Sequence, residues 1–359
     1  MTNTDGVQRP PLRLGVIGLG RAFFFEHLPA LKTLGELFRI VAVCDLLKER
    51  RDQVEKDIPD LRTYRRIDDM LDDADIDVIL VALPTIEHFS VTLNSLRHNK
   101  PTIVESPPST SLDEIKTLRV ATDFRTRNNL FVYTPGVFAP DFKLAMTALA
   151  DPRLGEVFEV RICHQDYIRR NDWQTIRRCR GGYLWHSGPD AILEALTLLR
   201  TRPAQLWSET KRIASLGDAE DLVRIMLKTR TAITADIEIC GAQLPPFSPS
   251  FTVRGSRGTF SVASGAADGM LHVIDPEFKL PRRRSSVRTP PLVDLHEDLP
   301  IVDIPLSLPD TSVCGALAFW RAVHASICTA APFPVPMDDI MDTIRYLQLI
   351  DKLNLKNKE

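Results

Sequence analysis

Residues 12–45 read LRLGVIGLGRAFFFEHLPALKTLGELFRIVAVCD, and this stretch decides the fold. It begins with a short apolar run, passes through Gly18-Leu19-Gly20 into a segment with apolar residues at helical spacing, and ends in a second apolar run before Asp45. Continuous apolar runs of this kind are typical of buried parallel strands. The order strand, Gly-x-Gly, helix, strand, acid predicts a nucleotide-binding unit.

The glycines and the acid of this unit each have a chemical role. Gly18 permits a tight turn, and Gly20 lets the backbone approach a pyrophosphate at the helix N-terminus, where N–H groups are unpaired. Arg21 follows Gly20 directly, and we predict that it also binds the cofactor. Asp45 can accept hydrogen bonds from a ribose 2′-hydroxyl and repels a 2′-phosphate. We therefore predict NAD as the cofactor. NADP is less favoured but not excluded, because two basic residues that could pair with a 2′-phosphate (Lys48 and Arg50) lie close to the acid.

The third position of the glycine motif is unusual. Phe23 stands where glycine or alanine usually permits close packing between helix and strand. Either the helix stands away from the strand, or the small Ala22 makes the close contact.

Strands and helices alternate as far as residue 135. This alternation predicts a doubly wound parallel sheet, whose ligands sit outside the carboxyl ends of its strands. Pro84, Glu105 and Ser106 should lie at that edge, where His88 should order the loop after Pro84. All four are therefore candidate cofactor-binding residues.

The pattern changes after residue 136. Several strand-like segments between residues 205 and 275 are separated by turn residues, as in an open, mostly antiparallel sheet. Residues 277–310 are rich in Pro and Arg and read as a long loop, and the chain ends in an amphipathic helix. We predict an α/β protein with two domains, residues 1–135 for nucleotide binding and residues 136–359 for substrate binding and oligomerisation.

Composition excludes several classes of function. The formal net charge of −2 gives no electrostatic reason to bind nucleic acid or an anionic membrane. No apolar run reaches the roughly 18 residues of a membrane helix, and the N-terminal segment lacks the apolar region of a secretory signal. The six cysteines are scattered without metal-ligand spacing. We expect a cytoplasmic protein with reduced thiols and no metal site.

Several motifs together resemble the Gfo/Idh/MocA oxidoreductase family. They are GVIGLGRA, AVCD, VALPTIEH, IVESP, the segment from RRNDW to GGYLWHSGPDAILEAL, GSRGTF and PFPVPMDDIMDTIRYL, in the family's order over nearly the whole chain. The resemblance implies a Rossmann domain followed by an α/β domain with an open sheet. It further implies NAD(P) between the two, a sugar-like or polyol substrate, and homodimers or homotetramers formed through the open sheet.

The chain departs from the family where protons are handled. Members usually carry Glu-Lys-Pro where this chain has Glu105-Ser106-Pro107, and the lysine helps to move the proton that accompanies hydride transfer. The family's usual histidine and aspartate correspond to Asp190 and Leu193 here. Serine has no pKa near neutrality and cannot replace the lysine as a base.

Three residues are candidates for the missing proton carrier. His186 and Asp190 can form a dyad in which the carboxylate raises the imidazole pKa. Alternatively, Asp190 only completes the start of a helix, whose dipole would hold its pKa low, and His186 merely packs. Tyr167 can donate a proton, although such tyrosines are more often packed with a satisfied hydroxyl.

The segment before this helix offers two further features. Its arginines suggest either an anionic substrate group or a solvated loop face (Arg169, Arg170, Arg177, Arg178 and Arg180). Trp173 and Trp185 can stack on a sugar ring or pack in the core.

Three functional hypotheses follow. The first is an NAD(P)-dependent oxidoreductase with a rearranged proton relay. The second is a dinucleotide-binding protein without dehydrogenase turnover, acting as a sensor or partner subunit. The third is glycoside cleavage by transient oxidation, which also requires acid–base groups.

Overall fold

The computed structural model describes residues 10–123, 129–230, 233–281, 298–309 and 314–356. Its N-terminal part contains a six-stranded sheet in the order β3-β2-β1-β4-β5-β6, in which every neighbouring pair is parallel. Its strands are β1 (Leu12–Ile17), β2 (Phe38–Cys44), β3 (Arg62–Tyr64), β4 (Val78–Val81), β5 (Thr102–Glu105) and β6 (Leu130–Tyr133). The predicted doubly wound sheet is confirmed, and its strand order reverses between β1 and β4.

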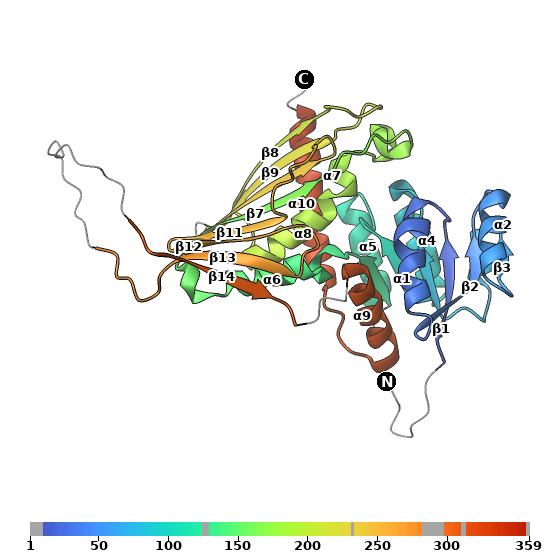
Figure 1. The fold of residues 1–359 in the computed structure, drawn as a ribbon. Helices are drawn as coiled ribbons and strands as arrows, with labels where there is room; N and C mark the ends of the chain where they lie inside the picture. Colours follow the sequence, from blue (N-terminus) through green and yellow to red (C-terminus); the bar gives the residue numbers. More distant parts are fainter. Residues whose placement is uncertain (1–9, 124–128, 231–232, 282–297, 310–313, 357–359) are drawn as a thin grey trace.

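Helices cover both faces of this sheet (Figure 1). They are α1 (Leu28–Thr33), α2 (Lys48–Asp57), α3 (Ile67–Leu71), α4 (Thr85–Arg97) and α5 (Leu112–Asp123). A π-helical turn, Phe23–His27, precedes α1. Phe23 is fully buried in the core of this region, and Ala22 lines the cavity described below. The bulky third motif residue is thus accommodated inside the core, where it does not block the glycine loop.

The C-terminal part contains an eight-stranded sheet in the order β14-β13-β12-β11-β7-β10-β9-β8. Only β7 and β10 pair in parallel, and the other neighbours are antiparallel, as predicted. The strands are β7 (Val157–Gln165), β8 (Gln205–Lys211), β9 (Leu222–Lys228), β10 (Thr234–Cys240), β11 (Phe251–Gly255), β12 (Gly258–Val262), β13 (Asp268–Ile274) and β14 (Ile301–Ser307).

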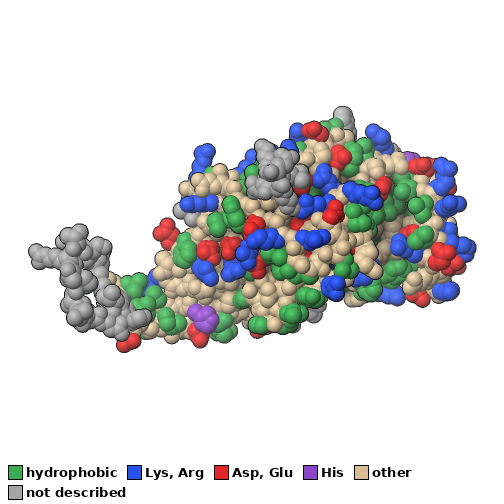
Figure 2. All heavy atoms as spheres, turned by 90° about the horizontal axis from the view of Figure 1, so that it is seen from above, with side chains coloured by type: hydrophobic (Ala, Val, Ile, Leu, Met, Phe, Trp, Pro, Cys, Tyr) green, Lys and Arg blue, Asp and Glu red, His purple; other side chains and the backbone are tan. Residues whose placement is uncertain are grey.

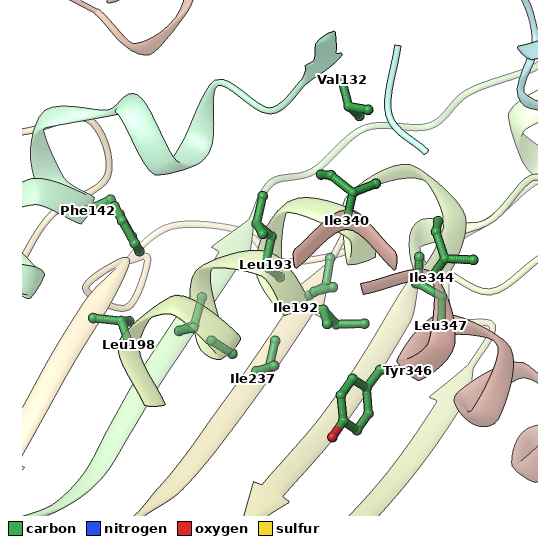
Figure 3. Packing of buried hydrophobic residues seen from close by; sticks show 14 of the residues in the cluster. Val132, Phe142, Ile192, Leu193, Leu198, Ile237, Ile340, Ile344, Tyr346 and Leu347 are labelled. Atoms are coloured by element: carbon green, nitrogen blue, oxygen red, sulfur yellow. The ribbon is translucent and has the colours of Figure 1, made fainter. Parts of the chain in front are cut away.

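The helices of this part are α6 (Pro140–Leu149), α7 (Tyr183–His186), α8 (Gly188–Leu199), α9 (Gly315–Thr329) and α10 (Met337–Lys356). Single 3₁₀ turns occur at Gly136–Phe138, Pro152–Leu154, Trp173–Thr175 and Arg177–Cys179. Helix α8 packs between the sheet and α10. Figure 3 shows Ile192 and Leu193 of α8 near Ile340, Ile344 and Leu347 of α10. Leu193 is therefore a core residue, and this packing holds the start of α8 in place.

Two features differ from the sequence expectations. Residues 277–310 are not one loop, because Ile301–Ser307 forms β14 and pairs along β13, while residues 282–297 lie outside the described residues. Helix α9 packs beside α1 of the N-terminal part, and its Phe319 and Trp320 are buried with Phe38 and Tyr133. The division of the chain at residue 135 stays a proposal.

The surface carries a mixture of charges. On the face drawn in Figure 2, Lys and Arg side chains are interspersed with Asp and Glu. Within the described ranges, every helix is too short or too polar to cross a lipid bilayer.

Candidate functional site

One cavity of about 600 Å³ opens at the carboxyl edge of the first sheet. One wall consists of residues that follow β1, β2, β4 and β5, and it includes Gly18, Gly20, Asp45, Pro84 and Ser106. The opposite wall comes from β7, the segment before α7, and the start of α8. Ten of the eleven residues predicted as site residues line this cavity: Gly18, Gly20, Arg21, Asp45, Pro84, His88, Glu105, Ser106, His186 and Asp190.

The glycine loop has the backbone geometry expected at a phosphate site. Gly18 has φ +94°, and an added Cβ would lie 2.5 Å from the carbonyl oxygen of Ala82. Gly20 lines the cavity, and helical structure begins at Arg21. The first backbone N–H groups of that helix therefore border the cavity, where an anion can accept from them.

Asp45 at the end of β2 braces the glycine loop. Its Oδ2 accepts a hydrogen bond from the backbone N–H of Leu19 (2.9 Å), and its Oδ1 accepts one from Leu47 (2.8 Å). Arg50 Nη1 lies 3.5 Å from Oδ2. The carboxylate retains acceptor capacity for a ribose hydroxyl, since each of its oxygens can accept more than one hydrogen bond.

Glu105 and His88 fix the edge next to Ser106. Glu105 Oε1 lies 2.6 Å from Nε2 of the fully buried His27. Burial alone would raise the pKa of Glu105, but the charge and hydrogen bond of His27 hold it below the usual value. The ring nitrogens of His88 each lie 2.7 Å from a carbonyl oxygen, Nδ1 from that of Pro107 and Nε2 from that of Leu83. His88 thus ties the turn after β4 to the turn after β5.

The predicted His186–Asp190 dyad is not formed. His186 Nε2 lies 3.2 Å from Arg170 Nη2, and Nδ1 lies 3.2 Å from Gln174 Nε2. The side chain of His186 is exposed to the cavity, and desolvation by the surrounding walls together with the nearby Arg170 charge lowers the pKa of His186. His186 is therefore uncharged at neutral pH and a weak base, because its neighbours are a guanidinium and an amide and no carboxylate of the described residues pairs with the ring.

Asp190 also differs from the expectation that the helix dipole would keep it ionised. Its Oδ1 is buried and has no hydrogen-bond partner among the described residues. Burial, followed by the charge of Glu194, raises the pKa of Asp190 well above its usual range. Desolvation and a like charge outweigh the dipole here, and both favour the neutral carboxylic acid.

Sequence reasoning missed a second pair in the same wall. His164 Nε2, at the end of β7, lies 2.9 Å from Glu194 Oε2 on α8. Burial would lower the pKa of His164, but the charge and hydrogen bond of Glu194 raise it to about 9. The alternation of side chains along β7 is a sequence signal for the inward position of His164, because His164 shares a face of the strand with the buried Val160 and Ile162.

The remaining candidates have more ordinary surroundings. Tyr167 follows the end of β7, is 47% exposed and does not line the cavity. Trp185 is buried, with Arg180 stacked on its ring at 5.1 Å. Both Trp173 and Trp185 line the cavity. Of the five arginines considered, Arg170 and Arg180 line the cavity.

A doubly wound sheet with an open glycine loop and an acid after β2, facing a polar cavity, defines a dinucleotide-dependent class of protein. Residues 12–133 match the model of the oxidoreductase family with an NAD-binding Rossmann fold, and residues 142–261 match the GFO/IDH/MocA C-terminal domain. The chain belongs to the Gfo/Idh/MocA oxidoreductase family.

Curated relatives and solved structures agree with this assignment. An uncharacterised oxidoreductase of Schizosaccharomyces pombe is 27% identical over 261 residues, 70% of each chain. The NADP⁺-dependent scyllo-inositol 2-dehydrogenase of Bacillus subtilis is 24% identical over 94% of this chain and 92% of its own. The WlbA dehydrogenase of Bordetella pertussis, solved with NADH and UDP-GlcNAcA, has the same fold, with a TM-score of 0.75 and 16% identity over 98% and 97% of the chains.

Proposed function

We propose that this protein is an NAD-dependent oxidoreductase that acts on a sugar-like or polyol-like small molecule through an atypical set of proton-handling groups. The observation that carries the proposal is a single cavity with two different walls. Gly18, Gly20 and Asp45 stand on one side, and His164 and Asp190 stand on the other. A bound dinucleotide and a small substrate would thus meet between them.

The residues present fit a nicotinamide dinucleotide. The backbone N–H groups at Gly20 and at the start of the helix from Arg21 can donate hydrogen bonds to the pyrophosphate. Asp45 can accept hydrogen bonds from the adenosine ribose. When bound, the cofactor supplies or accepts a hydride, which no side chain can do. We prefer NAD to NADP because Asp45 is ionisable and faces the ribose position, although Arg50 stands beside it.

Two observations support the proposed substrate class: the polar side chains of the cavity wall and the names of relatives. The cavity wall opposite the glycine loop offers hydrogen-bonding side chains, among them Arg170, Gln174 and His186. Such a lining suits a ligand with several hydroxyl groups. The names of two relatives refer to scyllo-inositol, and one neighbour was solved with a nucleotide sugar.

The proposal is tested by following NADH absorbance with a panel of inositols, aldoses and the corresponding carbonyl compounds, in both reaction directions. Wild type is expected to turn over at least one member. Ser106→Lys is expected to raise the rate of alcohol oxidation about tenfold or more, because a lysine at the end of β5 adds a base that serine lacks.

The matched control is Ser106→Met, which adds a side chain of similar length without a titratable group. Its oxidation rate should not rise. Cofactor binding without turnover of any compound, in wild type and in Ser106→Lys alike, would contradict the proposal and favour a dinucleotide-binding sensor or partner subunit.

We further propose that the protein is a cytoplasmic homodimer or homotetramer that associates through the second sheet. Trp207 of β8 pairs in register with Met226 of β9, and the two side chains are 52% and 45% exposed. Light scattering is expected to give a multiple of the 40.4 kDa chain mass and a smaller particle for Trp207→Glu. A monomeric wild type would contradict this.

A further inference from the structure

The wall formed by β7 and α8 holds two carboxyl groups and one cationic partner. Asp190 and Glu194 lie four residues apart, on the same face of α8. The hydrogen-bonded partner of Glu194 is His164, at 2.9 Å, and Oδ1 of Asp190 has no partner in the part of the chain that the structure describes. One positive charge balances only one carboxylate, so the buried arrangement favours one ionised and one neutral carboxyl group.

We propose that Asp190 is the general acid of a carbonyl reduction in this cavity and that its burial beside the Glu194 carboxylate, which His164 holds in place, favours its neutral form. This inference rests on the proposed function and adds to it a residue and a preferred direction. A site poised with a neutral acid favours reduction of a ketone or aldehyde over oxidation of an alcohol, because oxidation requires a base to take the hydroxyl proton.

The step balances as follows. A reduced nicotinamide cofactor held by Gly20 and Asp45 would supply a hydride to the substrate's carbonyl carbon, and the electron pair of the C=O π bond would move to oxygen. That oxygen takes the proton from the Asp190 carboxyl, which gives an alcohol, the oxidised cofactor and the Asp190 carboxylate. Asp190 would then regain a proton from water that enters the cavity it lines.

Glu194 and His164 act on this step through Asp190. The raised pKa of His164, about 9, keeps the ring charged beside Glu194 at neutral pH. The Glu194 charge in turn disfavours a second negative charge on Asp190. Gly136 helps to fix the arrangement, because an added Cβ there would lie 2.3 Å from Glu194 Oε1. Glu194 is thus a positioning residue, and Asp190 is the residue that faces the substrate.

The first test compares wild type with Asp190→Asn, which keeps the side chain's size but cannot give up a proton. We expect kcat for carbonyl reduction to fall by about 100-fold or more, with the NADH dissociation constant unchanged. The control is His272→Gln, which breaks a similar pair with Asp303 (2.6 Å) on β13 and β14, away from the cavity. It should leave kcat unchanged.

The second test does not depend on turnover. The infrared difference spectrum between wild type and Asp190→Asn at neutral pH should show the C=O stretch of a protonated carboxyl, and the His272→Gln difference should not. In Glu194→Gln, the loss of the neighbouring charge should shift the titration of this band to lower pH. The charged groups that face Asp190 are Glu194, His164, Glu105 and Glu26.

The pH profile follows from the same assignment. Reduction by wild type should slow as pH rises through the pKa of Asp190, because the acid is lost, and the midpoint should fall in Glu194→Gln. A wild type that turns over while Asp190→Asn is equally fast overturns the role of Asp190 and leaves the proposed function standing. A difference spectrum with only a carboxylate band also overturns it. No turnover by wild type in either direction overturns both.

Discussion

Gly18→Ala is expected to weaken NADH binding by about 100-fold or more and to lower the stability of the fold. The new Cβ would lie 2.5 Å from the oxygen and 2.8 Å from the carbon of the Ala82 carbonyl, and φ +94° is unfavourable for alanine. Backbone atoms cannot move aside cheaply, so the ends of β1 and β4 must separate and shift the loop that faces the pyrophosphate. Displacements of about 1 Å can cost 100-fold in such sites.

Two other glycines provide the controls. At Gly20 an added Cβ comes no closer than 4.0 Å to the Ala82 oxygen, so that Gly20→Ala should leave the thermal midpoint unchanged while it weakens NADH binding. Gly35 lies outside the cavity, with 3.8 Å to its nearest neighbour, so Gly35→Ala should change neither quantity. Wild-type affinity and melting temperature in Gly18→Ala would contradict the assignment of this turn.

His27→Leu is expected to destabilise the protein by about 3 kcal/mol, the lower end for a buried pair, because it leaves the largely buried Glu105 (16% exposed) without its His27 partner. The imidazole also packs between Tyr133 and Trp320, at ring-centroid distances of 4.4 and 5.7 Å. Thermal unfolding at pH 7 measures the loss.

The pH dependence of the His27 variant has a definite sign. The folded pKa of Glu105 lies below its ordinary value of 4.5, so its pairing stabilises the wild type above that pH and is lost as pH falls through the folded pKa. The free energy of unfolding of His27→Leu should therefore not show this loss of stability at acid pH. The control, His98→Leu, removes a partly exposed histidine 3.5 Å from Asp72 and should cost well below 1 kcal/mol. A loss equally small in His27→Leu would show that the buried pair contributes little.

The sequence predicted the nucleotide-binding part of the site well because the relevant signals are local. Gly18, Gly20 and Asp45 belong to one strand–helix–strand unit, and the carboxyl ends of parallel strands necessarily meet at one edge. Glu105 and Ser106 reach that edge for the same reason. The family resemblance added the expectation that the second part of the chain closes the cavity.

The rest of the site depends on contacts between distant segments. His164 and Glu194 are thirty residues apart in the sequence. The periodicity of β7 and that of α8 do not predict that these two side chains make contact. The pKa of Asp190 is raised chiefly by burial between distant segments and next by the charge of Glu194, and so an argument from the helix dipole alone gave the wrong direction for it. The packing of α9 against α1 and the pairing of β14 with β13 are also long-range contacts that no local pattern predicts. For β14, the surrounding sequence is rich in Pro and Arg and reads as a loop.

A fluorescence titration of the purified protein with NADH and with NADPH, after removal of any co-purified nucleotide, tests the central claim most directly. The account predicts saturable binding of NADH, with NADPH weaker by about tenfold, or 1.4 kcal/mol, because the Asp45 carboxylate repels a 2′-phosphate. Folded protein that binds neither nucleotide would contradict the account, since the cavity edged by Gly18, Gly20 and Asp45 would then not be a cofactor site.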